Sequence, residues 1–142
     1  MVDLTLPFLG AERSRRQYPF GDLHRAGAAL CAGSDWPVST PDPFAALHVA
    51  VNRTAYGADG PAGSEPFLPE QALDLTTAWA AYTSGSARIN GRDRLDGAGV
   101  LVPGAVADLV VLDRDPFTAP VAEIGAAQVV STWVAGVPVF EA

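Results

Sequence analysis

Asp35 is the residue in this sequence whose position best fits a chemical role. It closely follows a short apolar run, 28–32, bounded by Gly27 and Gly33. Such a run predicts a strand buried on both faces, and α/β proteins bind ligands at the carboxyl ends of such strands. A carboxylate placed there can ligate a cation or accept a proton from metal-bound water. The alternative is that Asp35 and Ser34 only cap the following turn, and the sequence leaves both interpretations open.

The remaining candidates for chemistry have weaker support. His24 and His48 lack the spacing that sets two imidazoles on one metal ion, so we expect structural or surface roles for both. Cys31 lies inside the apolar run, which favours a buried core residue over a nucleophile. Trp36 and Pro37 either form an apolar wall beside a substrate or pack into the core.

The composition excludes several classes of function. The 142 residues include 9 basic side chains, all of them arginine, and the net charge is -7. Without lysine the chain cannot form a Schiff base or use a lysine as general base. The negative charge and the scattered arginines argue against binding nucleic acid or an anionic membrane. A lone cysteine and the lack of a leader or an apolar span predict a cytoplasmic protein.

Two helices are well signalled in the first part of the chain. Asp42 and Pro43 predict the N-cap and first residue of a helix over about 43–53. Asp74 predicts the cap of a second helix over 75–89, whose inner face would include Ser86 and Ile89. The other segments are an irregular lead-in, two short helical pieces and a long loop, at residues 1–10, 11–18, 19–26 and 52–68.

After residue 91 the pattern changes to short strands. Strands are expected at 99–102, 109–112, 129–134 and 137–140, and the last two would meet in a hairpin at Ala135-Gly136. Asp108 stands in a turn directly before one of these strands, so we expect it to have a structural role.

Several segments together resemble one enzyme family. The Gly-Ser-Asp-Trp-Pro corner at 33–37, the helix at 78–84 and the run at 101–116 are similar to the C-terminal part of the metal-dependent amidohydrolase superfamily. Within it, the likeness is closest to amidohydrolase family 3, the YtcJ-like branch. The closing hairpin at 130–140 and the lead-in at 10–20 look like the same family. The order and spacing of these segments make the resemblance specific.

The resemblance implies an α/β enzyme built from a TIM-type (β/α)8 barrel and a small β-sandwich. Residues 1–90 would supply the last barrel strand, about 28–33, and barrel helices, and residues 91–142 the C-terminal strands of the sandwich. Asp35 would ligate a divalent metal, zinc by expectation, and shuttle a proton during hydrolysis of a non-peptide C–N bond in a small molecule. Trp36 and Pro37 would line the substrate rim.

The chain also departs from the family pattern. A complete barrel needs about 250 residues, so we expect an incomplete barrel, the C-terminal fragment of a longer hydrolase. The family's histidine pair, its metal-bridging residue and its later histidines have no match here, so the isolated chain is expected to be inactive. The alternative is a non-catalytic truncated domain that folds by self-association through its exposed strand edge. The expected partners are therefore a second copy or the missing N-terminal part.

Overall fold

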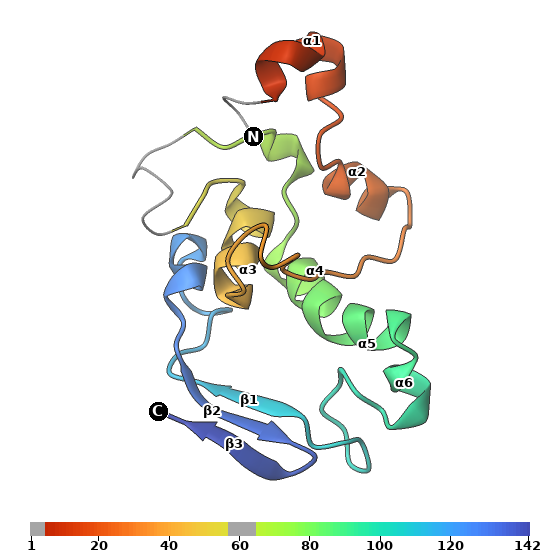
Figure 1. The fold of residues 1–142 in the computed structure, drawn as a ribbon, viewed down its shortest axis with the longest axis vertical. Helices are drawn as coiled ribbons and strands as arrows, with labels where there is room; N and C mark the ends of the chain where they lie inside the picture. The colour runs from red at the N-terminus through yellow and green to blue at the C-terminus, as the bar shows by residue number, and fades with distance from the viewer. Residues whose placement is uncertain (1–4, 57–64) are drawn as a thin grey trace.

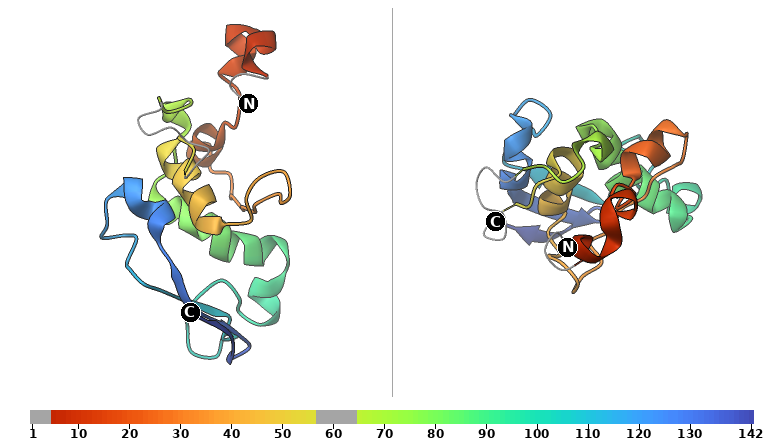
Figure 2. Two further views of the ribbon diagram at one scale, coloured as in Figure 1. Left: turned by 60° about the vertical axis from the view of Figure 1, so that its left-hand side comes forward. Right: turned by 90° about the horizontal axis from the view of Figure 1, so that it is seen from above.

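The computed structural model describes residues 5–56 and 65–142. Short helices fill the N-terminal part, and a small sheet formed by the last third of the chain lies at the opposite end of the molecule from helix α1 (Figures 1 and 2). None of the described helices is long and apolar enough to cross a membrane.

The first two helices are α1 (Leu6–Ser14), which is kinked at Gly10, and α2 (Phe20–Arg25). Helix α1 begins inside the segment predicted as an irregular lead-in, so that prediction is wrong from residue 6 onward; residues 1–4 lie outside the description. The 3-10 turn η2 (Pro69–Gln71) anchors α2, because the Gln71 side chain accepts from the Asp22 N–H at 3.0 Å and donates to its carboxylate at 2.9 Å.

Both well-signalled helices form with the caps expected from the sequence. In α3 (Pro43–Asn52), the Asp42 carboxylate accepts a hydrogen bond from the Phe44 N–H at 2.9 Å. In α4 (Leu75–Ala80), the Asp74 carboxylate accepts from the Thr77 N–H at 2.8 Å. These side chains satisfy N–H groups that a helix start leaves without partners.

Helix α4 continues through the π-helical turn η3 (Ala81–Gly85) into α5 (Ser86–Ile89). A π turn holds one residue more than an α turn and rotates the following residues around the axis. The inner face therefore passes through Ala81, Gly85 and Ala87, which are buried. Ile89, predicted to lie inward, is 72% exposed, so that part of the prediction is wrong.

The long loop predicted at 52–68 is described only at its two ends, because residues 57–64 lie outside the description. Arg53 and Phe67 close the loop at its base. The Phe67 N–H donates to the Arg53 carbonyl at 2.8 Å, and Arg53 Nε donates to the Phe67 carbonyl at 2.9 Å.

The strand predicted at 28–33 does not form. The segment has no regular secondary structure, and no strand of the described chain pairs with it. A strand needs a neighbouring strand for its ladder of hydrogen bonds, whereas this segment lies against the helix made by α4, η3 and α5. One side only is covered: Leu30 and Ala32 are partly buried, and Cys31 between them is exposed. The prediction of a cysteine in the core is therefore also wrong.

The sheet comprises β1 (Leu109–Leu112), β2 (Val129–Val134) and β3 (Val137–Glu141), antiparallel in the order β1-β2-β3. The hairpin turns at Ala135-Gly136, as predicted. The strand predicted at 99–102 is absent: Gly99 has φ +86°, which interrupts an extended strand, and the chain continues into a turn after the short helix α6 (Arg92–Leu95).

The core joins the helices to the C-terminal part through the 3-10 segment η4 (Val121–Ala126). The buried cluster consists of Phe44, Leu47, Ala78, Ile124 and Ala127. The described chain is thus a mixed helix–strand structure with a three-stranded antiparallel sheet. The division into a barrel part at 1–90 and a sandwich part at 91–142 stays a prediction.

Candidate functional site

Asp35 lies on the surface, in a turn that is organised by its neighbours. Ser34 Oγ accepts a hydrogen bond from the Trp36 N–H at 3.3 Å, and the Asp35 carbonyl accepts from the Val38 N–H at 2.9 Å. Asp35 has φ +53°, a conformation that aspartate tolerates better than most side chains. No group of the described residues binds its carboxylate. The side chain that caps this turn is that of Ser34, so the Asp35 carboxylate remains accessible.

Trp36 and Pro37 continue the same turn. Trp36 is 65% exposed, and Pro37 is exposed as well. The interpretation of these two residues as core packing is therefore wrong for the described chain. Their place beside Asp35 is compatible with the predicted rim, which stays a prediction.

The segment that leads to Asp35 is fixed by hydrogen bonds to the facing helix. The Ala32 N–H donates to the Ala81 carbonyl at 3.0 Å, and Ser86 Oγ donates to the Ala32 carbonyl at 2.7 Å. The Tyr82 hydroxyl donates to the Gly33 carbonyl at 3.4 Å. Burial raises the pKa of Tyr82, which keeps this hydroxyl protonated as a donor.

Gly85 allows the helix and the segment to approach closely. A Cβ atom at this position would clash with the Leu30 carbonyl oxygen, so glycine is required here. Sequence reasoning missed Gly85, Tyr82 and Ser86 as parts of the site. The signal in the sequence was the run of small residues at 83–87, because small side chains let another segment of the chain pack closely against a helix.

His48 is a structural residue, as predicted. The Asn52 amide nitrogen donates to the Val121 carbonyl at 2.8 Å and lies 3.2 Å from His48 Nδ1, so Nδ1 acts as an acceptor. The ring proton then sits on Nε2, which donates to Thr54 Oγ1 at 3.2 Å. Burial lowers the pKa of His48, in agreement with a neutral ring.

The fit of a metal ion can be tested on the described residues. They contain no group of three or more histidine, cysteine, aspartate or glutamate side chains close enough to hold one. His24 is exposed and lies on α2, where Nε2 is 3.5 Å from Thr77 Oγ1, and Asp35 is a single carboxylate. These side chains therefore do not fit a complete metal centre by themselves.

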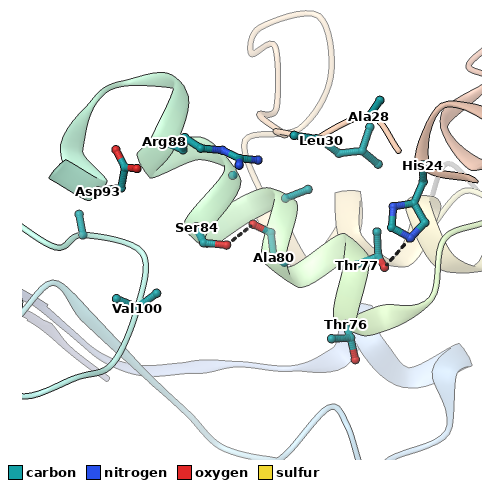
Figure 3. Close-up of a pocket in the computed structure, with 14 residues that line it drawn as sticks. His24, Ala28, Leu30, Thr76, Thr77, Ala80, Ser84, Arg88, Asp93 and Val100 are labelled. Atoms are coloured by element: carbon teal, nitrogen blue, oxygen red, sulfur yellow. Dashed lines mark hydrogen bonds between the residues drawn. The ribbon is translucent and has the colours of Figure 1, made fainter. Parts of the chain in front are cut away.

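Two cavities lie beside the segment 28–33, and neither is lined by Asp35. The first, of about 600 Å³, has mixed walls in which the side chains of His24, Thr77, Arg88 and Asp93 lie among small apolar residues (Figure 3). The second, of about 740 Å³, has mostly apolar walls that include Cys31. Each cavity is thus lined both by the segment and by the helix that faces it.

The described chain is thus a mixed helix–strand structure in which a surface turn displays the accessible carboxylate of Asp35. The family model described as "Amidohydrolase family" matches residues 2–140, and the chain belongs to this family.

Two curated proteins are similar to the chain. An N-substituted formamide deformylase from Arthrobacter pascens is 33% identical over 125 residues, which are 87% of this chain and 21% of that protein. The putative amidohydrolase YtcJ of Bacillus subtilis (strain 168) is 29% identical over 134 residues, 94% of this chain and 24% of that protein. The chain thus spans about a quarter or less of the length of either relative. No solved structure matches it.

Proposed function

We propose that the chain is part of an enzyme that hydrolyses a non-peptide C–N bond, and that Asp35 transfers the proton of this reaction. The carboxylate accepts a proton from the attacking water as the water oxygen bonds to the carbonyl carbon. It then gives this proton to the nitrogen as the C–N bond breaks. The observation that carries the proposal is the accessible Asp35 carboxylate in a turn that Ser34 holds. Family membership supports the type of bond.

The metal belongs to the proposal only at the level of the family. Amidohydrolases are generally metal-dependent, and we propose Asp35 as one ligand of a divalent ion such as zinc. The described residues do not fit a complete metal centre, so the proton transfer proposed above rests on the Asp35 carboxylate. In this proposal the remaining ligands belong to parts of the enzyme outside the described residues, and the 142-residue chain alone is inactive.

The substrate class that we propose is an N-substituted formamide, following the name of the relative that is 33% identical. Hydrolysis would release formate and an amine. The exposed ring of Trp36, with Pro37, would contact the apolar substituent on the nitrogen.

Asp35→Asn in the full-length protein tests the proposal. The amide keeps the size of the side chain but cannot accept the proton, so we expect kcat for formate release to fall by about 10²- to 10⁴-fold. Glu123→Gln, which neutralises an exposed carboxylate on η4, is the matched control and should leave kcat unchanged. Full activity of Asp35→Asn would contradict the assigned role, and absence of any hydrolysis by the wild type would contradict the function.

Self-association without catalysis is a second candidate, favoured by the unpaired segment 28–33 and the apolar cavity beside it. An unpaired apolar segment tends to pair with another chain. Light scattering of the 142-residue chain should then show a dimer, whereas a monomer at high concentration argues against this candidate.

A further inference from the structure

The helix behind Asp35 changes its geometry where the segment 28–35 touches it. The π turn η3 covers Ala81–Gly85, and the carbonyl of its first residue accepts hydrogen bonds from two groups outside the helical ladder. These are the Ala32 N–H and the Ser86 hydroxyl, each at 3.0 Å from the Ala81 oxygen. Single π turns inside α-helices are frequent at functional sites.

Ser86 connects the helix to the segment. Its Oγ lies 2.7 Å from the Ala32 carbonyl oxygen and 3.0 Å from the Ala81 carbonyl oxygen, so its single proton is shared between the segment 28–35 and the helix, with the shorter contact to Ala32. Together with the Ala32 N–H bond to Ala81, this satisfies both backbone groups of Ala32. Ser86 is partly buried, which shields these hydrogen bonds from water.

These contacts end just before the candidate catalytic residue. Ala32 and Gly33 are the last residues of the segment that the helix holds, and Ser34 then organises the turn that carries Asp35. The close approach of Gly85 to Leu30 lets the helix lie directly against the segment 28–35. The position of the Asp35 backbone therefore depends on the contact between Ser86 and Ala32.

We propose that Ser86 is a positioning residue for Asp35, which it holds through the Ala32 carbonyl. This inference rests on the proposed function, because it assumes that Asp35 transfers a proton. Ser86 touches neither Asp35 nor the substrate. Its loss would let the segment 32–35 shift and would misplace the carboxylate, while substrate binding would be retained.

Ser86→Ala in the full-length protein is the main test, with hydrolysis of an N-substituted formamide as the assay. A small displacement of a catalytic group is costly, so we expect kcat to fall by about tenfold and KM to stay within about twofold. Ser86→Thr retains the hydroxyl and should restore kcat to within about threefold of the wild type. Ser84→Ala is the matched control, because Ser84 Oγ donates to a carbonyl of its own helix, that of Ala80, at 3.2 Å.

A double variant separates positioning from a general effect on folding. If Ser86 acts through Asp35, then Ser86→Ala should cost nothing further in an Asp35→Asn background. An equal loss in both backgrounds would show a merely structural role and overturn the inference. If Ser86→Ala fails to fold, then Ser86→Cys, which keeps the size of the side chain but replaces the hydroxyl with a weaker donor, takes its place, and unchanged kcat in that variant also overturns the inference.

The two proposals fail in different ways. Wild-type activity in Asp35→Asn refutes the proposed role of Asp35 and with it the reason for positioning. Loss of activity in Asp35→Asn with unchanged kcat in Ser86→Ala refutes only the positioning by Ser86.

Discussion

The carboxylate of Asp108 accepts a hydrogen bond at 2.8 Å from the backbone N–H of Ala135, in the turn of the β2–β3 hairpin. Its second oxygen accepts from Arg92 Nη2 at 3.1 Å, and Arg92 in turn binds Asp96. One side chain before β1 thus joins the hairpin turn to helix α6. The structural role that the sequence predicts for Asp108 is confirmed by these contacts.

Replacement of Asp108 should therefore weaken the C-terminal part of the chain. Asp108→Ala removes the acceptor for the Ala135 N–H, and we expect the free energy of unfolding to fall by about 1–2 kcal/mol. Asp108→Asn keeps an acceptor oxygen and loses only a surface ion pair, which is worth about 0.5 kcal/mol. Urea unfolding of both variants measures the difference, with Asp93→Ala on α6 as the control. Equal losses for alanine and asparagine would refute the importance of this hydrogen bond.

Ile124 is the side chain on which the core between α3 and η4 depends most. It is 0% exposed and belongs to the cluster with Phe44 and Leu47. Ile124→Ala should lower the free energy of unfolding by about 2–5 kcal/mol, since it leaves a cavity in a packed core. Val121→Ala, on the same element but 52% exposed, should cost about 0.5 kcal/mol. Thermal unfolding compares the two, and similar melting temperatures would contradict this account of the core.

Local signals in the sequence predicted the elements whose stability is local. Asp42 and Asp74 cap helices through hydrogen bonds to residues two and three positions away, so their positions could be inferred from the sequence alone. The hairpin at Ala135-Gly136 is likewise a short-range feature. The choice of Asp35 as a candidate rested on a strand at 28–33 that does not form, and its role stays a prediction.

The predictions that are wrong depend on contacts between distant parts of the chain. An apolar run becomes a strand only if another strand lies beside it, and residues 28–33 bind η3 and α5 instead. The π turn at Ala81–Gly85 has no simple sequence signal, yet it changes which face of the helix is buried. The connection from Ser86 to Ala32 spans 54 positions and could not be inferred from spacing.

Acid should destabilise the chain partly through Asp113. The Arg114 guanidinium and the Gln128 N–H bind this carboxylate and lower its pKa from the ordinary 3.8 to about 2. Because the folded state holds the proton less tightly than the unfolded state, this stabilisation is present above pH 3.8 and is lost as the pH falls toward 2. Asp113→Asn should therefore lose less stability than the wild type between about pH 4 and pH 2.

Melting temperatures across this range measure the effect of Asp113. Asp115→Asn is the control, because among the described residues this carboxylate accepts from the Phe117 N–H, at 2.9 Å, and from no arginine. It should retain the full acid dependence of the wild type. If Asp113→Asn shows the same acid dependence as the wild type, then the contact with Arg114 does not stabilise the folded state.

His48 should make the chain less stable in mild acid. This loss of stability should begin at a higher pH than the loss caused by Asp113. Burial lowers its pKa below the ordinary 6.5, and Nδ1 accepts from Asn52, so a second ring proton would point at an N–H group. The unfolded chain binds this proton more tightly than the folded chain. Stability is therefore fully present above pH 6.5 and falls as the pH decreases toward the lowered pKa of the folded state.

The measurement for His48 is the free energy of unfolding at about pH 7 and about pH 5, a window in which a histidine with an ordinary pKa becomes protonated. His48→Gln removes the titrating ring, so its stability should change less between the two pH values than that of the wild type. His24→Gln, which removes the exposed histidine of α2, should keep the wild-type dependence. A wild-type slope in His48→Gln would show that the buried ring is protonated in the folded state or that other groups cause the effect.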